Sequence, residues 1–188
     1  MAAKKTTALI FVLGVWLGSS ILLLWVVGSS FPGVERAVVE NNRLAAAAGF
    51  APGQDAAKKV SVPWVVAGEL NRQYFAGWNV GQLALAVCAL VFASRSGPRG
   101  ALLGLCGAGL IVLALTFWLA PEITTLGRSL DFVPREPPPA ALESFNRLHG
   151  IYTALELVKV ALIALATWLS FNSLETATGG EDSPQPVS

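Results

Sequence analysis

The sequence predicts an all-α integral membrane protein that crosses the bilayer as a four-helix bundle, with an additional surface helix between helices one and two. Composition is the first observation behind this prediction. Of the 188 residues, 54% are hydrophobic and only 13% are charged, whereas roughly 25% of the residues of a soluble domain are charged. The second observation is that the apolar residues form four runs of about 20 residues, the length that an α-helix needs to span the hydrocarbon core.

The first spanning helix is predicted over residues 8–28, which contain no charge. At about 1.5 Å per residue this segment covers roughly 30 Å, the thickness of the hydrocarbon core. Lys4 and Lys5 precede it, as basic residues do in a signal peptide, but the run is longer than the apolar region of such peptides, about 7–15 residues. We therefore expect a retained membrane anchor.

Residues 31–70 are expected to lie outside the membrane and to contain helix. Residues 32–48 start with Pro32, which is favoured in a first helical turn, and end before Gly49, so they predict a surface helix. A second helical start follows Ser61. This helix is expected to continue without a break into the second span.

The remaining spans are predicted over residues 73–94, 101–121 and 148–171. Residues 94–100 contain Gly, Pro and two arginines, so the second and third spans should form an antiparallel hairpin with a tight turn. Proline-rich residues 126–144 predict an irregular loop, after which helix four should restart near Ala140 or Ala141.

The whole of residues 1–172 is predicted to form a single transmembrane domain. Residues 173–188 are polar and rich in Gly, Pro and Ser, and we expect a disordered tail there.

Charge distribution suggests the location and the orientation. The basic residues are scattered singly or in pairs, which argues against a nucleic-acid partner and leaves the lipid bilayer as the expected one. Four spans place both termini on the side of the hairpin turn, where Lys4, Lys5, Arg95 and Arg99 flank the apolar runs. Short basic flanks favour the cytoplasm. We expect a multi-pass protein of the bacterial inner membrane with both termini cytoplasmic.

Helix four carries two charges inside its apolar run, Glu156 and Lys159, three residues apart on one face. A charge at the bilayer centre costs about 2.5–3.5 kcal/mol on insertion scales, so such residues face the bundle interior and need partners. A mutual ion pair at this spacing reduces the cost of both. His149 and Tyr152 continue the polar stripe towards the start of the helix.

Helix two carries a second polar stripe, formed by Arg72, Asn79 and Gln82 at helical spacing. We expect the two stripes to meet as a candidate intramembrane polar site. The favoured interpretation is hydrogen-bonded packing that fixes the helix register. The alternatives are a polar cavity or a proton or substrate path, and lipid-facing side chains whose charged ends reach the interface.

Small residues predict two close-packing surfaces in the membrane. Gly14 and Gly18 form a small-xxx-small pair on helix one, and Gly104 and Gly107 make helix three narrow near its start. The sequence leaves open whether these surfaces pack within the chain, against other membrane subunits or in a homo-oligomer.

The sequence predicts no metal, no cofactor and no enzymatic reaction. Cys88 and Cys106 lie in apolar runs without CxxC spacing and are expected to be small buried apolar residues. His149 is the only histidine, which excludes bis-histidine haem ligation within one chain. We find no Ser/His/Asp order, zinc-protease motif, P-loop or dinucleotide fingerprint.

Four short elements resemble the transmembrane-protein-205-like family, whose shared domain has no assigned activity. They are residues 15–18 (VWLG), 67–70 (AGEL), 121–123 (PEI) and 145–150 (FNRLHG), of which the last is the most specific. The resemblance covers most of residues 8–171 and implies a four-helix membrane protein. It implies no biochemical activity.

Three functions remain open from the sequence. The first is an accessory or scaffold subunit that binds a larger membrane assembly through its glycine-rich faces and long loops. The second is small-molecule or proton transport or export along the polar stripes of helices two and four. A third, least favoured, is a membrane redox protein that binds haem or quinone through His149.

Overall fold

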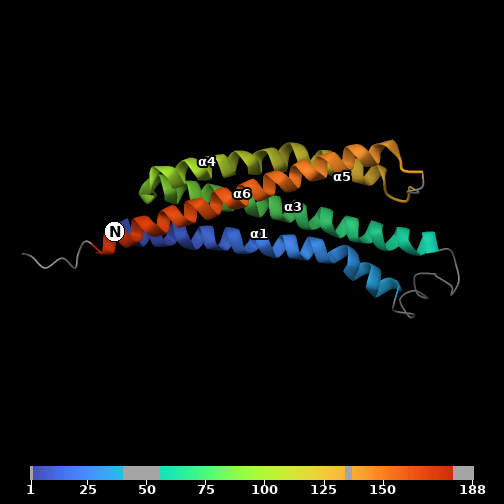
Figure 1. The fold of residues 1–188 in the computed structure, drawn as a ribbon, viewed down its shortest axis with the longest axis horizontal. Coiled ribbons are helices and arrows are strands. Elements are labelled where there is room, and N and C mark those ends of the chain that lie inside the picture. Colours follow the sequence, from blue (N-terminus) through green and yellow to red (C-terminus); the bar gives the residue numbers. More distant parts are fainter. Residues whose placement is uncertain (1, 40–55, 134–136, 180–188) are drawn as a thin grey trace, which may run out of the picture. The chain divides into compact units, whose positions relative to one another are not determined.

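The computed structural model describes residues 2–39, 56–133 and 137–179, and these residues are almost entirely helical. Figure 1 shows the elements in chain order. They are α1 (Ala2–Val39), α3 (Ala56–Ser96), α4 (Arg99–Ala114), the π-helical segment η1 (Leu115–Leu119), α5 (Ala120–Ser129) and α6 (Ala140–Gly179).

Four stretches of these helices are long and apolar enough to cross a membrane. Each contains the span predicted from the sequence, so the all-α fold of four packed helices, each able to span a membrane, is confirmed. The four stretches are Lys4–Val34, Trp64–Ser96, Arg99–Ser129 and Ala140–Thr176.

The chain divides into two compact units, and each unit contains a part of α1, α3 and α6. Unit 1 comprises Met1–Ser20, Asn79–Thr116 and Thr153–Ser188. Unit 2 comprises Ile21–Trp78 and Phe117–Tyr152.

The core of unit 1 follows the helical period, because its buried side chains recur every three or four residues. Many large apolar side chains point away from this core, as expected of helices surrounded by lipid: Phe11 is 71% exposed and Leu103 is 73% exposed. The buried apolar residues are Leu9, Leu13 and Trp16 on α1; Ala86, Ala89 and Ala93 on α3; Ala101, Leu105, Ala108, Val112 and Leu115 on α4 and η1; and Ile163 and Ala166 on α6.

Helix α1 continues through Pro32, where the sequence predicted the start of a separate surface helix. Residues 32–39 therefore belong to α1, and the rest of the predicted surface helix, residues 40–48, lies outside the described residues. Helix α1 bends in its C-terminal part (Figure 1). A proline removes one backbone hydrogen bond, and the Ser29 and Ser30 hydroxyls donate to carbonyl oxygens three residues back just before it.

The predicted hairpin is confirmed, because α3 ends at Ser96 and α4 begins at Arg99. The Gly97 amide donates to the Ala93 carbonyl at 2.8 Å. A Cβ at Gly97 would lie 3.0 Å from the Ala93 backbone, so this tight turn favours glycine. Helix α3 also runs without a break from Ala56, as predicted, although its start lies before Ser61.

The π-helical segment η1 has a local cause in Pro121, which follows it closely in the first turn of α5. The proline ring would clash with the carbonyl of the residue four positions earlier, and a wider turn relieves that clash. The α4, η1 and α5 segments thereby stay one continuous helical stretch from Arg99 to Ser129.

Three boundary or burial expectations need correction. Residues 126–129, which the sequence placed in a loop, belong to α5, whereas α6 starts at Ala140 as predicted. Helix α6 also extends to Gly179, into the predicted polar tail, because residues 173–178 contain no proline or glycine to stop it. Cys88 and Cys106 are exposed on the outside of their helices, not buried in the core.

Candidate intramembrane polar site

Four of the predicted polar residues meet in unit 1, where they form a buried cluster of Asn79, Gln82, Glu156 and Lys159. The Lys159 ammonium donates to Gln82 Oε1 on α3 and to Glu156 Oε2, the latter at 2.5 Å. The Gln82 amide nitrogen donates in turn to Asn79 Oδ1 at 3.5 Å. The cluster therefore joins α6 to α3 by side-chain hydrogen bonds.

Burial of these four side chains is nearly complete. Lys159 and Gln82 have no exposed surface, and Glu156 and Asn79 are 5% and 6% exposed. Glu156 and Lys159 share the inward face of α6 with Ile163, one turn further on. The helical period thus turns both charges inward, as the sequence predicted.

Charge balance makes this burial tolerable. The cluster contains one cation and one anion, so its formal charge is zero, and each charge has the other as its partner. A lysine ammonium can only donate hydrogen bonds, so the Gln82 oxygen must face it. The Gln82 amide nitrogen is then left to bond Asn79. This order of donors and acceptors fixes the rotation of α3 against α6 within unit 1.

One atom of the cluster lacks a partner. Glu156 Oε1 is buried and accepts no hydrogen bond from the residues that the structure describes. A buried carboxylate oxygen without a donor costs about 1–3 kcal/mol or more. The cluster is therefore not fully explained by helix packing alone.

The structure places Tyr152 and His149 in unit 2. Tyr152 is buried, and its ring meets Phe75 edge to face with centroids 5.4 Å apart. His149 is exposed and stacks on Phe145 at 5.8 Å, one turn earlier on α6.

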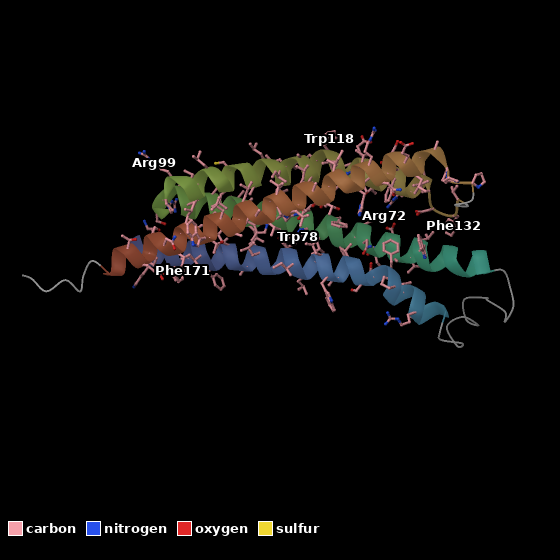
Figure 2. All side chains as sticks on the ribbon, in the orientation of Figure 1. Arg72, Trp78, Arg99, Trp118, Phe132 and Phe171 are labelled. Atoms are coloured by element: carbon pink, nitrogen blue, oxygen red, sulfur yellow. The ribbon has the colours of Figure 1, made fainter. Side chains whose placement is uncertain are left out.

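Arg72 belongs to a different group, an ion-pair cluster in unit 2 formed by Glu69, Arg72, Arg128 and Asp131. Its guanidinium contacts Glu69 and Asp131, each at 2.9 Å, and Arg128 lies 3.7 Å from Glu69. Arg72 is labelled on α3 in Figure 2. This cluster holds two cations and two anions, and its side chains are between 15% and 63% exposed.

Close packing on Gly127 positions the Arg72 guanidinium. A Cβ at Gly127 would lie 3.4 Å from both Arg72 Nη2 and the Phe145 ring. The bare backbone of α5 therefore lets the flat guanidinium approach Asp131, which lies just after that helix.

Sequence reasoning missed two polar contacts of unit 2. Asn71 is buried on α3 and accepts a hydrogen bond from Ser30 on α1 at 2.8 Å. Asp131, in the turn after α5, provides the second carboxylate for Arg72. The spacing of Glu69 and Arg72, three residues apart, was a signal for the first of these ion pairs.

The four predicted packing glycines behave in two ways. A Cβ at Gly104 or Gly107 would lie 3.6 or 3.4 Å from Leu162 of α6, so these glycines face a helix of the same chain. A Cβ at Gly14 or Gly18 would meet nothing within 4 Å, and both glycines are exposed. Only the pair on α4 is used for packing among the described residues.

Comparison with known proteins finds no protein-family model, no curated protein and no solved structure that matches this chain. The resemblance to the transmembrane-protein-205-like family thus rests on the four short sequence elements.

Proposed function

We propose that the protein is an accessory or scaffold subunit of a larger membrane assembly, without enzymatic activity of its own. We place it in the bacterial inner membrane with both termini in the cytoplasm, and in the family that its sequence resembles. The surface proposed to bind the partner is the exposed face of α1 around Gly14 and Gly18.

The observation that supports this proposal is the contrast between the two glycine pairs. Gly104 and Gly107 contact Leu162, whereas Gly14 and Gly18 leave a narrow strip of α1 that no described residue covers. Helices in lipid associate mainly through van der Waals contact, and small residues let two backbones approach closely. An unused small-xxx-small pair is what a second transmembrane helix from a partner would need.

Large apolar side chains border the strip and suit such a partner. Phe11 and Val15, three residues before Gly14 and Gly18, are 71% and 41% exposed on α1. This spacing produces a ridge beside the groove that the glycines leave. A partner helix could therefore pack along several turns of α1.

A native mass spectrum of the protein, extracted gently from its own membrane, tests this proposal. We expect wild type to leave the membrane bound to larger subunits at fixed stoichiometry. Gly14→Leu and Gly18→Leu should release it, because a leucine fills the groove. Gly77→Leu is the matched control, since Gly77 is also exposed with nothing within 4 Å of its Cβ position.

Two results would contradict the accessory role. Wild type could appear alone or only as a homo-oligomer, or all three leucine variants could keep the partner. Circular dichroism of each purified variant shows whether the helices remain intact, so that loss of the partner is not mistaken for loss of the fold.

A second candidate function, transport of protons or of a small polar molecule, is favoured by one observation. Glu156 Oε1 is a buried acceptor without a donor among the described residues. Intramembrane charges often mark such paths. Flux into proteoliposomes separates the two candidates: a transporter loses flux in Glu156→Gln, whereas an accessory subunit shows no flux in either form.

A further inference from the structure

Exposed basic side chains collect at the hairpin end of unit 1, and none of them forms an ion pair with a described residue. Thr6 of α1 bonds the Ser96 carbonyl at the end of α3 at 3.5 Å, so the start of α1 lies beside the turn. In the described part of unit 1, Glu175 of α6 is the only exposed acid. The exposed cations at this end are Lys4, Lys5, Arg95 and Arg99.

The cations of the ion-pair cluster in unit 2 differ, because carboxylates of the protein balance them. Arg72 has two carboxylate partners at 2.9 Å, and Arg128 lies 3.7 Å from Glu69. The cations at the hairpin end flank the apolar spans, so in a bilayer they reach the depth of the lipid phosphates. The headgroups of anionic lipids therefore supply the counter-charge that the described residues of this end do not.

An apolar stripe on the outside of α4 leads from Arg99 into the membrane. The spacing of four, three and four residues keeps Arg99, Leu103, Cys106 and Leu110 on one face of this helix. Leu103 and Leu110 are 73% and 67% exposed, and Cys106 between them is also exposed. At about 1.5 Å per residue, the stripe from Arg99 to Leu110 is roughly 16 Å long. This length matches one leaflet, which is about half of the hydrocarbon core of roughly 30 Å.

The turn of the hairpin places two arginines at the head of this stripe. Arg95 lies in the last turn of α3 and Arg99 begins α4, and the Gly97 amide closes the turn on the Ala93 carbonyl at 2.8 Å. A guanidinium donates two parallel hydrogen bonds to a phosphate. A phospholipid uses both the arginines and the stripe, whereas free phosphate uses only the arginines. The excess of cations also repels the ammonium of a zwitterionic headgroup, so a headgroup with net negative charge fits best.

We propose that the hairpin end of unit 1 binds a phospholipid with an anionic headgroup. Its phosphate accepts hydrogen bonds from Arg95 and Arg99, and one acyl chain lies along Leu103, Cys106 and Leu110 of α4. This site does not depend on the accessory role, since it lies on α4 and the turn, whereas the proposed partner surface lies on α1.

Native mass spectrometry of the full chain in detergent, mixed with phosphatidylglycerol or phosphatidylcholine of the same acyl chains, tests the headgroup. Wild type should retain phosphatidylglycerol preferentially. Arg95→Gln/Arg99→Gln should lower that retention by about fivefold for each arginine removed, the effect of one basic residue near an anionic surface. The matched control is Arg36→Gln/Arg147→Gln, which removes the same charge from exposed arginines of unit 2 and should keep the preference.

The stripe is tested by Leu103→Ser/Leu110→Ser, which should also weaken retention of phosphatidylglycerol. Val80→Ser/Val87→Ser is its control, because these valines of α3 have the same spacing, lie in unit 1 and are 69% and 61% exposed. Circular dichroism shows that each variant keeps its helices.

Three results would overturn the lipid site. Wild type could retain both lipids equally, a control pair could lose as much retention as its test pair, or inorganic phosphate could displace the lipid. The last result would show that the arginines bind a bare anion and that the stripe contributes nothing.

Discussion

The buried cluster of unit 1 and the ion-pair cluster of unit 2 are built on the same plan. In each, a base lies three residues after an acid on one helix and donates to an oxygen of a second segment. Their exposure differs: the Lys159 and Glu156 side chains are 0% and 7% exposed, whereas those of Arg72 and Glu69 are 15% and 44% exposed.

This difference shows that the surroundings of an ion pair, and not the contact itself, determine how much the pair contributes to stability. An exposed pair contributes about 0–1 kcal/mol because water solvates both charges when they separate. A buried pair that loses one partner leaves an unsolvated charge behind, at a cost of about 3–5 kcal/mol. The choice of base fits this contrast, since the planar guanidinium of Arg72 bridges two carboxylates, whereas the ammonium of Lys159 is a compact charge beside Glu156.

The largest effect is expected from Glu156→Leu. It removes the carboxylate that balances the buried Lys159 ammonium, and should destabilise the bundle by about 3–5 kcal/mol. Unfolding in a titration with a denaturing detergent measures this loss. A change below about 1 kcal/mol, the range of an exposed pair, would remove the distinction between the two clusters.

The double variant Glu156→Leu/Lys159→Leu sharpens the comparison. Replacing both members of a buried pair by apolar side chains is often neutral or stabilising. We therefore expect the double variant to recover most of the stability that Glu156→Leu loses in the same detergent titration. If the double variant is instead less stable than Glu156→Leu alone, Glu156 and Lys159 do not act as a coupled pair.

A smaller effect is expected from Asp131→Asn in the ion-pair cluster. Arg72 keeps Glu69 as a partner, and the Arg72 and Asp131 side chains retain 15% and 23% exposure, so the loss should be smaller than that of Glu156→Leu. Because salt screens exposed charges, the difference from wild type should shrink between low and high salt. The midpoint of thermal unfolding, recorded at both salt concentrations, measures this difference in stability. A difference that does not change with salt would contradict the conclusion that water solvates the charges of this cluster.

The smallest effect is expected from Glu69→Gln, since the Glu69 side chain is 44% exposed, more than the 23% of Asp131. At high salt, the midpoint of thermal unfolding of Glu69→Gln should equal that of Glu122→Gln. Glu122→Gln is the control because Glu122 is an exposed carboxylate on α5. A clear loss of stability at high salt would show that Glu69 contributes more than an exposed charge does.

The sequence predicted the four spans and the inward direction of Glu156, Lys159 and Gln82, because length, apolar runs and helical period are local properties. It did not separate Arg72 from Asn79 and Gln82, although all three share a stripe of α3. The missing information was the position of Asp131, a partner far away in the sequence that only the packing of α5 brings close.

The sequence pattern also did not predict that α1 continues through Pro32. Proline is favoured in a first helical turn, so a new start was the simplest prediction. In the structure α1 continues through Pro32, and the Ser30 hydroxyl just before it bonds Asn71 of α3, a contact that ties this part of α1 to α3. Which glycines pack inside the chain likewise depends on the neighbouring helices.

Thiol labelling of two matched positions most directly tests the interpretation that the two clusters differ in exposure because the buried cluster lies in the membrane and the ion-pair cluster lies in water. Cys88 and Cys106 are first replaced by alanine, and Val87 or Arg128 is changed to cysteine. Val87 is 61% exposed and the Arg128 side chain 63% exposed, so the protein itself shields them equally.

In membranes opened to a water-soluble maleimide on both sides, we predict rapid labelling of Arg128→Cys. We predict no labelling of Val87→Cys, which lies in the uncharged stretch of α3 that also contains Gln82, until detergent and denaturant expose it. Equal labelling of the two cysteines in intact membranes would contradict the account.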